Sequence, residues 1–154
     1  MRDYAIVSPH FWTGHTGRQI RKLGHEAQVI ALYLMTAPGS NMIGLYYLPL
    51  PSLAHETGCP IEGASKGLTD LENLGFCRYD PESEVVWVCE MARWQIGEQI
   101  KEGDKRHGRV SKEVYSYANS PFYHAFMERY GASFRLVTTP SSKGHRRGIE
   151  GARV

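Results

Sequence analysis

The side chains of this sequence that are best suited to chemistry are cations that could hold a polyanion. Arg18, Arg21 and Lys22 recur at helical spacing, and a second group comes late in the chain. The second group is Lys105, Arg106 and Arg109. Guanidinium and ammonium groups neutralise phosphates, which supply most of the non-specific affinity for nucleic acids. Both groups therefore predict contacts with a phosphate backbone, and each is also typical of a solvated surface.

Signatures of catalysis and of metal binding do not occur in the sequence. The seven histidines are scattered, and no HExxH, CxxC, GxxxxGK[ST] or GxSxG pattern is present. Zinc sites, phosphate-binding loops and nucleophile elbows need such residues at defined spacing. We therefore expect no enzymatic activity, no cofactor and no metal.

Cysteine usage and hydropathy bear on location. Cys59, Cys77 and Cys89 are far apart and odd in number, which argues against a disulfide framework. No apolar run approaches the roughly 20 residues of a membrane span, and the first residues do not resemble a secretory signal. We expect a cytoplasmic protein that makes no membrane contact.

The charge is distributed unevenly along the chain. The net charge of +2 comprises +2 in residues 1–48, −6 in residues 49–90 and +6 in residues 91–154. An acidic middle third between more basic ends is a pattern that bears on partners rather than on fold.

Residues 25–88 carry the clearest structural signal. Residues 25–36 have apolar side chains at helical spacing, and a β-prone stretch over 44–50 contains prolines typical of an edge strand. A helix over 52–57 ends at Gly58, and a second helix over 60–74 has a stripe formed by Ile61, Ala64, Leu68 and Leu71. Residues 76–79 and 85–88 predict a hairpin. We expect an α+β fold, a winged helix-turn-helix with extra N-terminal and C-terminal helices.

The flanking segments give weaker patterns. We expect a short extended segment over 3–12, a helix over 16–23, a helix near 109–118, and a last helix that is capped near Asn119 and Pro121. The expected organisation is an N-terminal extension (1–24), a winged-helix domain (25–95), a C-terminal helical extension (96–137) and a disordered basic tail (138–154).

The second helix of such a fold normally enters a DNA groove. Its exposed polar side chains are predicted to be Ser65, Lys66, Thr69 and Asn73, with Arg78 at the base of the hairpin placed to meet a phosphate. Two cations against eight acids over 49–90 oppose a polyanion, so the remaining cations must come from the flanking groups. An acidic helix and hairpin also suit a basic protein partner.

The chain resembles a known family over roughly its first two thirds. The stretches GLYYLPLPSLAHETG, ASKGLTDLENLGFCRYDPESEVVWV and MARWQ between Gly44 and Gln95 are similar to the N-terminal winged-helix domains of phage replication-initiation and replisome-organiser proteins, the group related to DnaD. The resemblance implies a winged helix that binds DNA or replisome proteins.

Two functions follow as expectations. The first is non-enzymatic binding of duplex DNA, of phage replication-initiator type. The second is a protein-docking module, an inhibitor or adaptor of a host nucleic-acid machine, that uses the acidic helix and hairpin. A positive stripe joining residues 18–22 to residues 105–109 beside Lys66 would favour DNA, and an isolated acidic surface would favour a protein.

Overall fold

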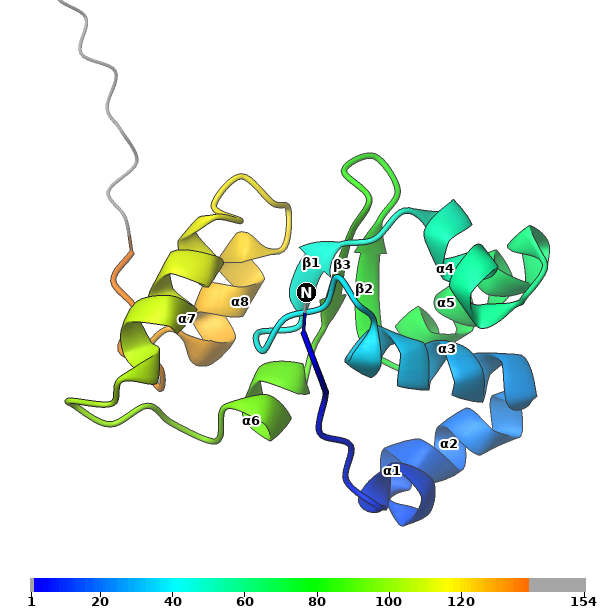
Figure 1. Ribbon diagram of the computed structural model, residues 1–154, viewed down its shortest axis with the longest axis horizontal. Helices are drawn as coiled ribbons and strands as arrows, with labels where there is room; N and C mark the ends of the chain where they lie inside the picture. Colours follow the sequence, from blue (N-terminus) through cyan, green and yellow to red (C-terminus); the bar gives the residue numbers. More distant parts are fainter. Residues whose placement is uncertain (1, 139–154) are drawn as a thin grey trace, which may run out of the picture.

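The structure, a computed structural model, describes residues 2–138 and places a three-stranded antiparallel sheet between two groups of helices (Figure 1). The helices before the last two strands are α1 (His10–Thr13), α2 (His15–Leu23), α3 (His25–Thr36), α4 (Leu50–Thr57) and α5 (Ile61–Asn73). The strands are β1 (Leu45–Tyr47), β2 (Cys77–Asp80) and β3 (Val85–Val88). The remaining helices are α6 (Met91–Gln95), α7 (Arg106–Tyr115) and α8 (Tyr123–Tyr130).

The sheet has the order β1-β3-β2, so the last strand in sequence lies in the middle. Tyr46 pairs with Val86, and Cys77 pairs with Val88 on the other edge. Pro49 closes β1, as expected for an edge strand, because proline cannot donate to a strand ladder. The α+β class is confirmed, and the order helix, strand, helix, helix, hairpin is compatible with a winged helix.

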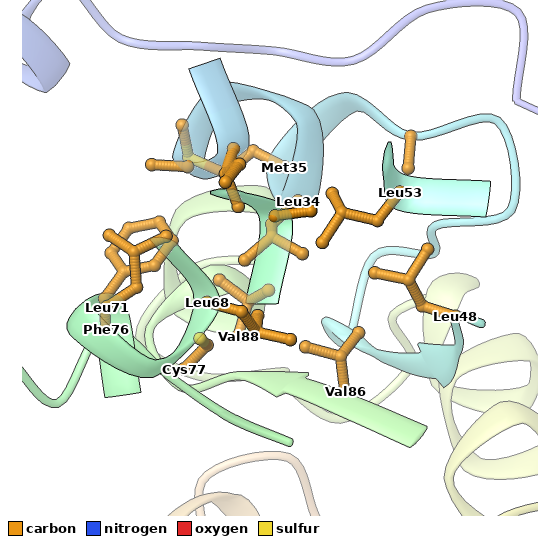
Figure 2. Close-up of a cluster of buried hydrophobic side chains, with 14 of the residues drawn as sticks. Leu34, Met35, Leu48, Leu53, Leu68, Leu71, Phe76, Cys77, Val86 and Val88 are labelled. Carbon is orange, nitrogen blue, oxygen red and sulfur yellow. The ribbon is translucent and has the colours of Figure 1, made fainter. Parts of the chain in front are cut away.

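The first helix group, helices α1 to α5, lies on one surface of the sheet. Figure 2 shows its apolar cluster, which includes Leu34 of α3, Leu71 of α5, and Val86 and Val88 of the central strand. All four side chains are buried. Burying apolar area of this kind is the main force that holds the helices on the sheet.

Two glycines let α5 approach α3 closely. A side chain at Gly67 would overlap the side chain of Ile30, and a Cβ at Gly63 would lie 2.8 Å from Glu26 Oε2. The sequence GASKG, residues 63–67, thus presents a surface without side chains to α3 at both glycines. The opposite surface of α5 is therefore turned toward solvent.

The second helix group, helices α7 and α8, covers the other surface of the sheet. Val85 and Trp87 alternate with Val86 and Val88 along β3, and they pack with residues of α7 and α8 such as Val114 and Phe126. All four residues of β3 are therefore buried. The two helix groups appear on opposite sides of the sheet in Figure 1. The expected boundary at residue 95 passes through this shared core.

Several predicted elements are confirmed, and others need correction. The helix over 25–36, the hairpin and the left-handed Gly58 are as expected. Residues 10–13 form α1 instead of continuing an extended segment, and α7 begins three residues before the expected start. Ile61, placed in the buried stripe of the second helix, is 43% exposed, because it lies in the first turn, beyond the cover of α3.

Two further differences lie near the C-terminus. Residues 91–95 form helix α6, where no helix was predicted. Helix α8 begins at Tyr123, after Pro121, and its N-cap residue Phe122 makes no side-chain cap, but Ser120 Oγ accepts a hydrogen bond from the Phe122 backbone at 3.2 Å. The predicted tail lies almost entirely outside the described residues.

Candidate nucleic-acid interface

The exposed surface of α5 gathers four of the predicted contact residues. Ser65, Lys66, Thr69 and Asn73 are all exposed, as their spacing on one helix predicts. Lys66 donates to Asp70 Oδ2 at 2.6 Å, one turn further along. The hydrogen bond raises the pKa of Lys66, and the carboxylate cancels its charge at short range. This surface is therefore polar but offers no unpaired cation.

The hairpin beside α5 carries only acidic charge at its tip. Asp80 accepts hydrogen bonds from the backbone and hydroxyl of Ser83, which closes the turn. Glu84 accepts a hydrogen bond from the Tyr47 hydroxyl at 2.8 Å. The turn holds Asp80 and the Tyr47 hydroxyl of β1 holds Glu84, so both carboxylates would face a DNA backbone as fixed negative charges.

Arg78 points away from the predicted groove surface. It pairs with Trp87, so the two side chains share one surface of the sheet. Its guanidinium lies 5.0 Å from the ring centroid of Phe122 in the second helix group. Contact with a phosphate beside α5 is therefore not supported for Arg78, because strand register directs it to the opposite side.

Helix α2 holds three cations without a salt-bridge partner among residues 2–138. Arg18, Arg21 and Lys22 are exposed and lie at i, i+3 and i+4, on one flank of the helix. None of the three forms a salt bridge within residues 2–138. The opposite flank buries Ile20 against α3, and α2 also contacts α5. The cationic flank of α2 is thus part of the same helix group as α5.

The late basic group lies in a different place. Arg106 is bound to Asp104 and donates to the carbonyl of Ile96, and Lys105 is exposed at the start of α7. Arg109 lines a polar pocket against the N-terminal segment. Because α7 covers the surface of the sheet opposite α5, residues 105–109 do not continue the cationic flank of α2. The single positive stripe considered above is not formed.

An apolar cavity of about 410 Å³ lies between the N-terminal segment and the first helix group. Phe11 and Ile20 line it from one side, and Met35, Phe76 and Trp94 line it from the other. Sequence patterns did not point to this cavity, since its walls come from segments more than 80 residues apart in the chain.

Other kinds of site are scarce within the part of the chain that the structure describes. Among residues 2–138, no three His, Cys, Asp or Glu side chains are grouped to hold a metal ion. Over the same residues, no helix combines the length and apolar character needed to cross a membrane.

Comparison with known proteins adds no relative. Neither a protein-family model, nor a curated protein, nor a solved structure matches the chain. The resemblance to replication-initiation proteins therefore stays a prediction.

Proposed function

We propose that this protein is a non-enzymatic nucleic-acid-binding protein with a winged helix-turn-helix, in which α4 and α5 form the helix pair and β2 and β3 form the wing. The cationic flank of α2 carries this proposal. Like charges at i, i+3 and i+4 destabilise a helix by a few tenths of a kcal/mol per pair. Arg21 and Lys22 lie in the last turn of α2, where the helix dipole favours cations and offsets this repulsion. The proposal therefore rests on the exposure of the three cations and on their lack of a salt-bridge partner within residues 2–138, which leave them available to phosphates.

The proposed interface combines α2 with α5. Arg18, Arg21 and Lys22 neutralise phosphates, and the polar side chains of Ser65, Thr69 and Asn73 lie toward the groove. Duplex DNA is the proposed ligand, because a helix of this kind fits the major groove. A role in phage replication initiation belongs to the same proposal and is supported by the sequence resemblance alone. A cytoplasmic location is also part of the proposal, supported by the cysteine usage and hydropathy of the sequence.

The salt dependence of duplex binding tests the role of α2. The slope of log K against log salt concentration is negative, and each lost phosphate contact makes it less negative by about 0.9. We expect Arg18→Gln/Arg21→Gln to make the slope less negative by roughly 1.8, as measured by fluorescence anisotropy from 50 to 200 mM salt.

Lys101→Gln/Lys112→Gln is the matched control, because it removes the same charge from exposed positions in and beside α7. It should leave the slope near that of the wild type. If both double variants weaken duplex binding equally, the attraction is a non-specific one between DNA and the protein's basic residues. The absence of duplex binding at 50 mM salt would refute the proposal.

One observation favours a second candidate function, a docking site for a basic protein. Lys66 is paired with Asp70, so the surface formed by α5 and the hairpin tip has net negative charge. Neutralising Glu62 and Glu82 separates the two functions. If DNA lies against this surface, Glu62→Gln/Glu82→Gln should strengthen duplex binding by removing repulsion. Unchanged affinity would indicate that this surface serves another partner.

A further inference from the structure

A small polar pocket brings together charged residues from three distant parts of the chain. Its volume is about 200 Å³, and it lies between the N-terminal segment, the loop before β1 and helix α7. Arg2 comes from the first of these, Ser40 from the second, and Arg109 and Glu113 from the third. The closest of these segments in sequence are separated by 38 residues.

Ser40 is the part of the pocket that is fixed most firmly. It is the one polar residue classed as buried among residues 2–138, and it is 6% exposed. Its Oγ accepts a hydrogen bond from Arg2 Nη1 at 3.3 Å, and its own proton has no protein acceptor within the described chain. Gln95 holds the Arg2 guanidinium in position, because Arg2 Nη2 donates to Gln95 Oε1 at 2.8 Å.

The two arginines of the pocket do not pair with the Glu113 carboxylate beside them. Neither Arg2 nor Arg109 forms a salt bridge with Glu113 within the part of the chain that is described. Arg109 makes no side-chain hydrogen bond there either. Two guanidinium groups with N–H donors still available lie beside a hydroxyl that can also donate. Tetrahedral oxyanions accept hydrogen bonds from such a set of donors.

We propose that this pocket binds a phosphate-sized oxyanion through Arg2, Ser40 and Arg109. The pocket is smaller than the 300–1,000 Å³ of typical sites for drug-sized ligands, so it suits a phosphate group better than a whole nucleotide. No residue of α2 or α5 lines the pocket, so the site does not depend on the proposed duplex interface.

Glu113 makes this binding depend on pH. Burial raises the pKa of Glu113, while Arg109 and Arg2 lower it, and the Tyr117 hydroxyl is the other titratable group coupled to it. The ionised carboxylate repels an anion, whereas the protonated form is neutral and can donate a hydrogen bond. Anion affinity should therefore rise as pH falls through the pKa of Glu113.

Sulfate is a suitable first probe, because its charge stays constant from pH 5 to 8. Its binding should be measured by calorimetry at constant ionic strength, with chloride as the replaced anion. Arg109→Gln should weaken sulfate binding about tenfold, the usual effect of losing one charge-assisted hydrogen bond. Ser40→Ala should weaken it severalfold.

Lys112→Gln is the matched control, since it removes an exposed cation from the same helix but does not line the pocket. It should bind sulfate as the wild type does. Sulfate binding no stronger than chloride binding, or equal weakening by Lys112→Gln and Arg109→Gln, would overturn the proposal.

Glu113→Gln tests the pH dependence, because it mimics the protonated carboxyl. The variant should bind sulfate more tightly than the wild type at pH 7.5 and should show a flat pH profile. Weaker binding by Glu113→Gln would instead mean that the pocket needs a carboxylate, which contradicts an oxyanion site.

The phosphate group could belong to free phosphate or to the end of a nucleic-acid strand. Inorganic phosphate and short single strands with a 5′-phosphate or a 5′-hydroxyl distinguish these sources. Tighter binding of the phosphorylated strand, lost in Arg109→Gln, would assign the site to strand ends, and equal affinity for phosphate alone would assign it to the free anion. Both results support the site. Because Arg18→Gln/Arg21→Gln leaves it intact, failure of the duplex interface would be seen separately.

Discussion

At the scale of single residues, Gly44 shows how tightly the first strand is held against the end of the central strand. Its φ is 73°, and a Cβ there would lie 2.6 Å from Met91 Cβ and 2.8 Å from the Val88 oxygen. The Gly44 carbonyl also accepts a hydrogen bond from the Val88 backbone at 2.8 Å. Both the backbone conformation and the space require glycine.

We expect Gly44→Ala to destabilise the protein by roughly 2–4 kcal/mol, from the left-handed backbone and the steric overlap together. Gly58→Ala is the matched control, because Gly58 has a φ of 72° but no atom within 4 Å of the added carbon. It should cost only the backbone part, about 1–2 kcal/mol. Urea denaturation measures both, and equal losses would show that the space around Gly44 is not limiting.

At the scale of elements, the start of α7 is tied down by one charged residue. Asp104 accepts hydrogen bonds from the Arg106 backbone at 2.9 Å and from its guanidinium at 2.8 Å. The same guanidinium reaches the carbonyl of Ile96, which joins the loop after α6 to the helix. These bonds to Arg106 lower the pKa of Asp104 to about 2.

Because the folded pKa of Asp104 lies below its ordinary value of about 3.9, ionised Asp104 stabilises the folded state above about pH 4. That contribution is lost as pH falls through 2. We expect Asp104→Asn to lower the melting temperature at pH 7, and the difference from the wild type should shrink between pH 4 and pH 2. Circular dichroism melts at several pH values measure it.

Asp3→Asn provides the control, because Asp3 is exposed and makes no side-chain hydrogen bond within the described residues. It should melt like the wild type throughout. A gap between Asp104→Asn and the wild type that stays constant down to pH 2 would contradict this role of the carboxylate.

At the scale of the whole molecule, the two apolar cores share the central strand. Val86 and Val88 belong to the core under α3 and α5, and Val85 and Trp87 belong to the core under α7 and α8. Loss of one core would leave one surface of β3 exposed to water, so the two helix groups should unfold together.

We expect Phe126→Ala, in the second core, to cost roughly 3–5 kcal/mol, and Leu71→Ala, in the first, to cost roughly 2–5 kcal/mol. Both side chains are fully buried. Each variant should unfold in a single transition, with coincident curves from far-ultraviolet circular dichroism and tryptophan fluorescence. Two separate transitions in Phe126→Ala would show that the C-terminal helices unfold independently of the first core.

The elements that the sequence predicted correctly depend on neighbours a few residues away. Helix α3 follows from apolar side chains at helical spacing, β1 from its flanking prolines, and the hairpin from two β-prone runs around an Asp-Pro turn. The exposure of Ser65, Thr69 and Asn73 follows from the same periodicity. Such signals are local, because backbone preferences and helix or strand period act within one or two turns.

What only the tertiary structure decided is which surfaces meet. Three features depend on α7 and α8 covering the second surface of the sheet: the contact of Arg78 with Phe122, the separation of residues 105–109 from α2, and the pocket of Arg2, Ser40 and Arg109. The run Val85–Val88 carried a signal for that cover, since four apolar residues in succession are typical of a strand buried on both surfaces. The sequence alone cannot say which helices provide the cover, because that choice depends on packing between residues far apart in the chain.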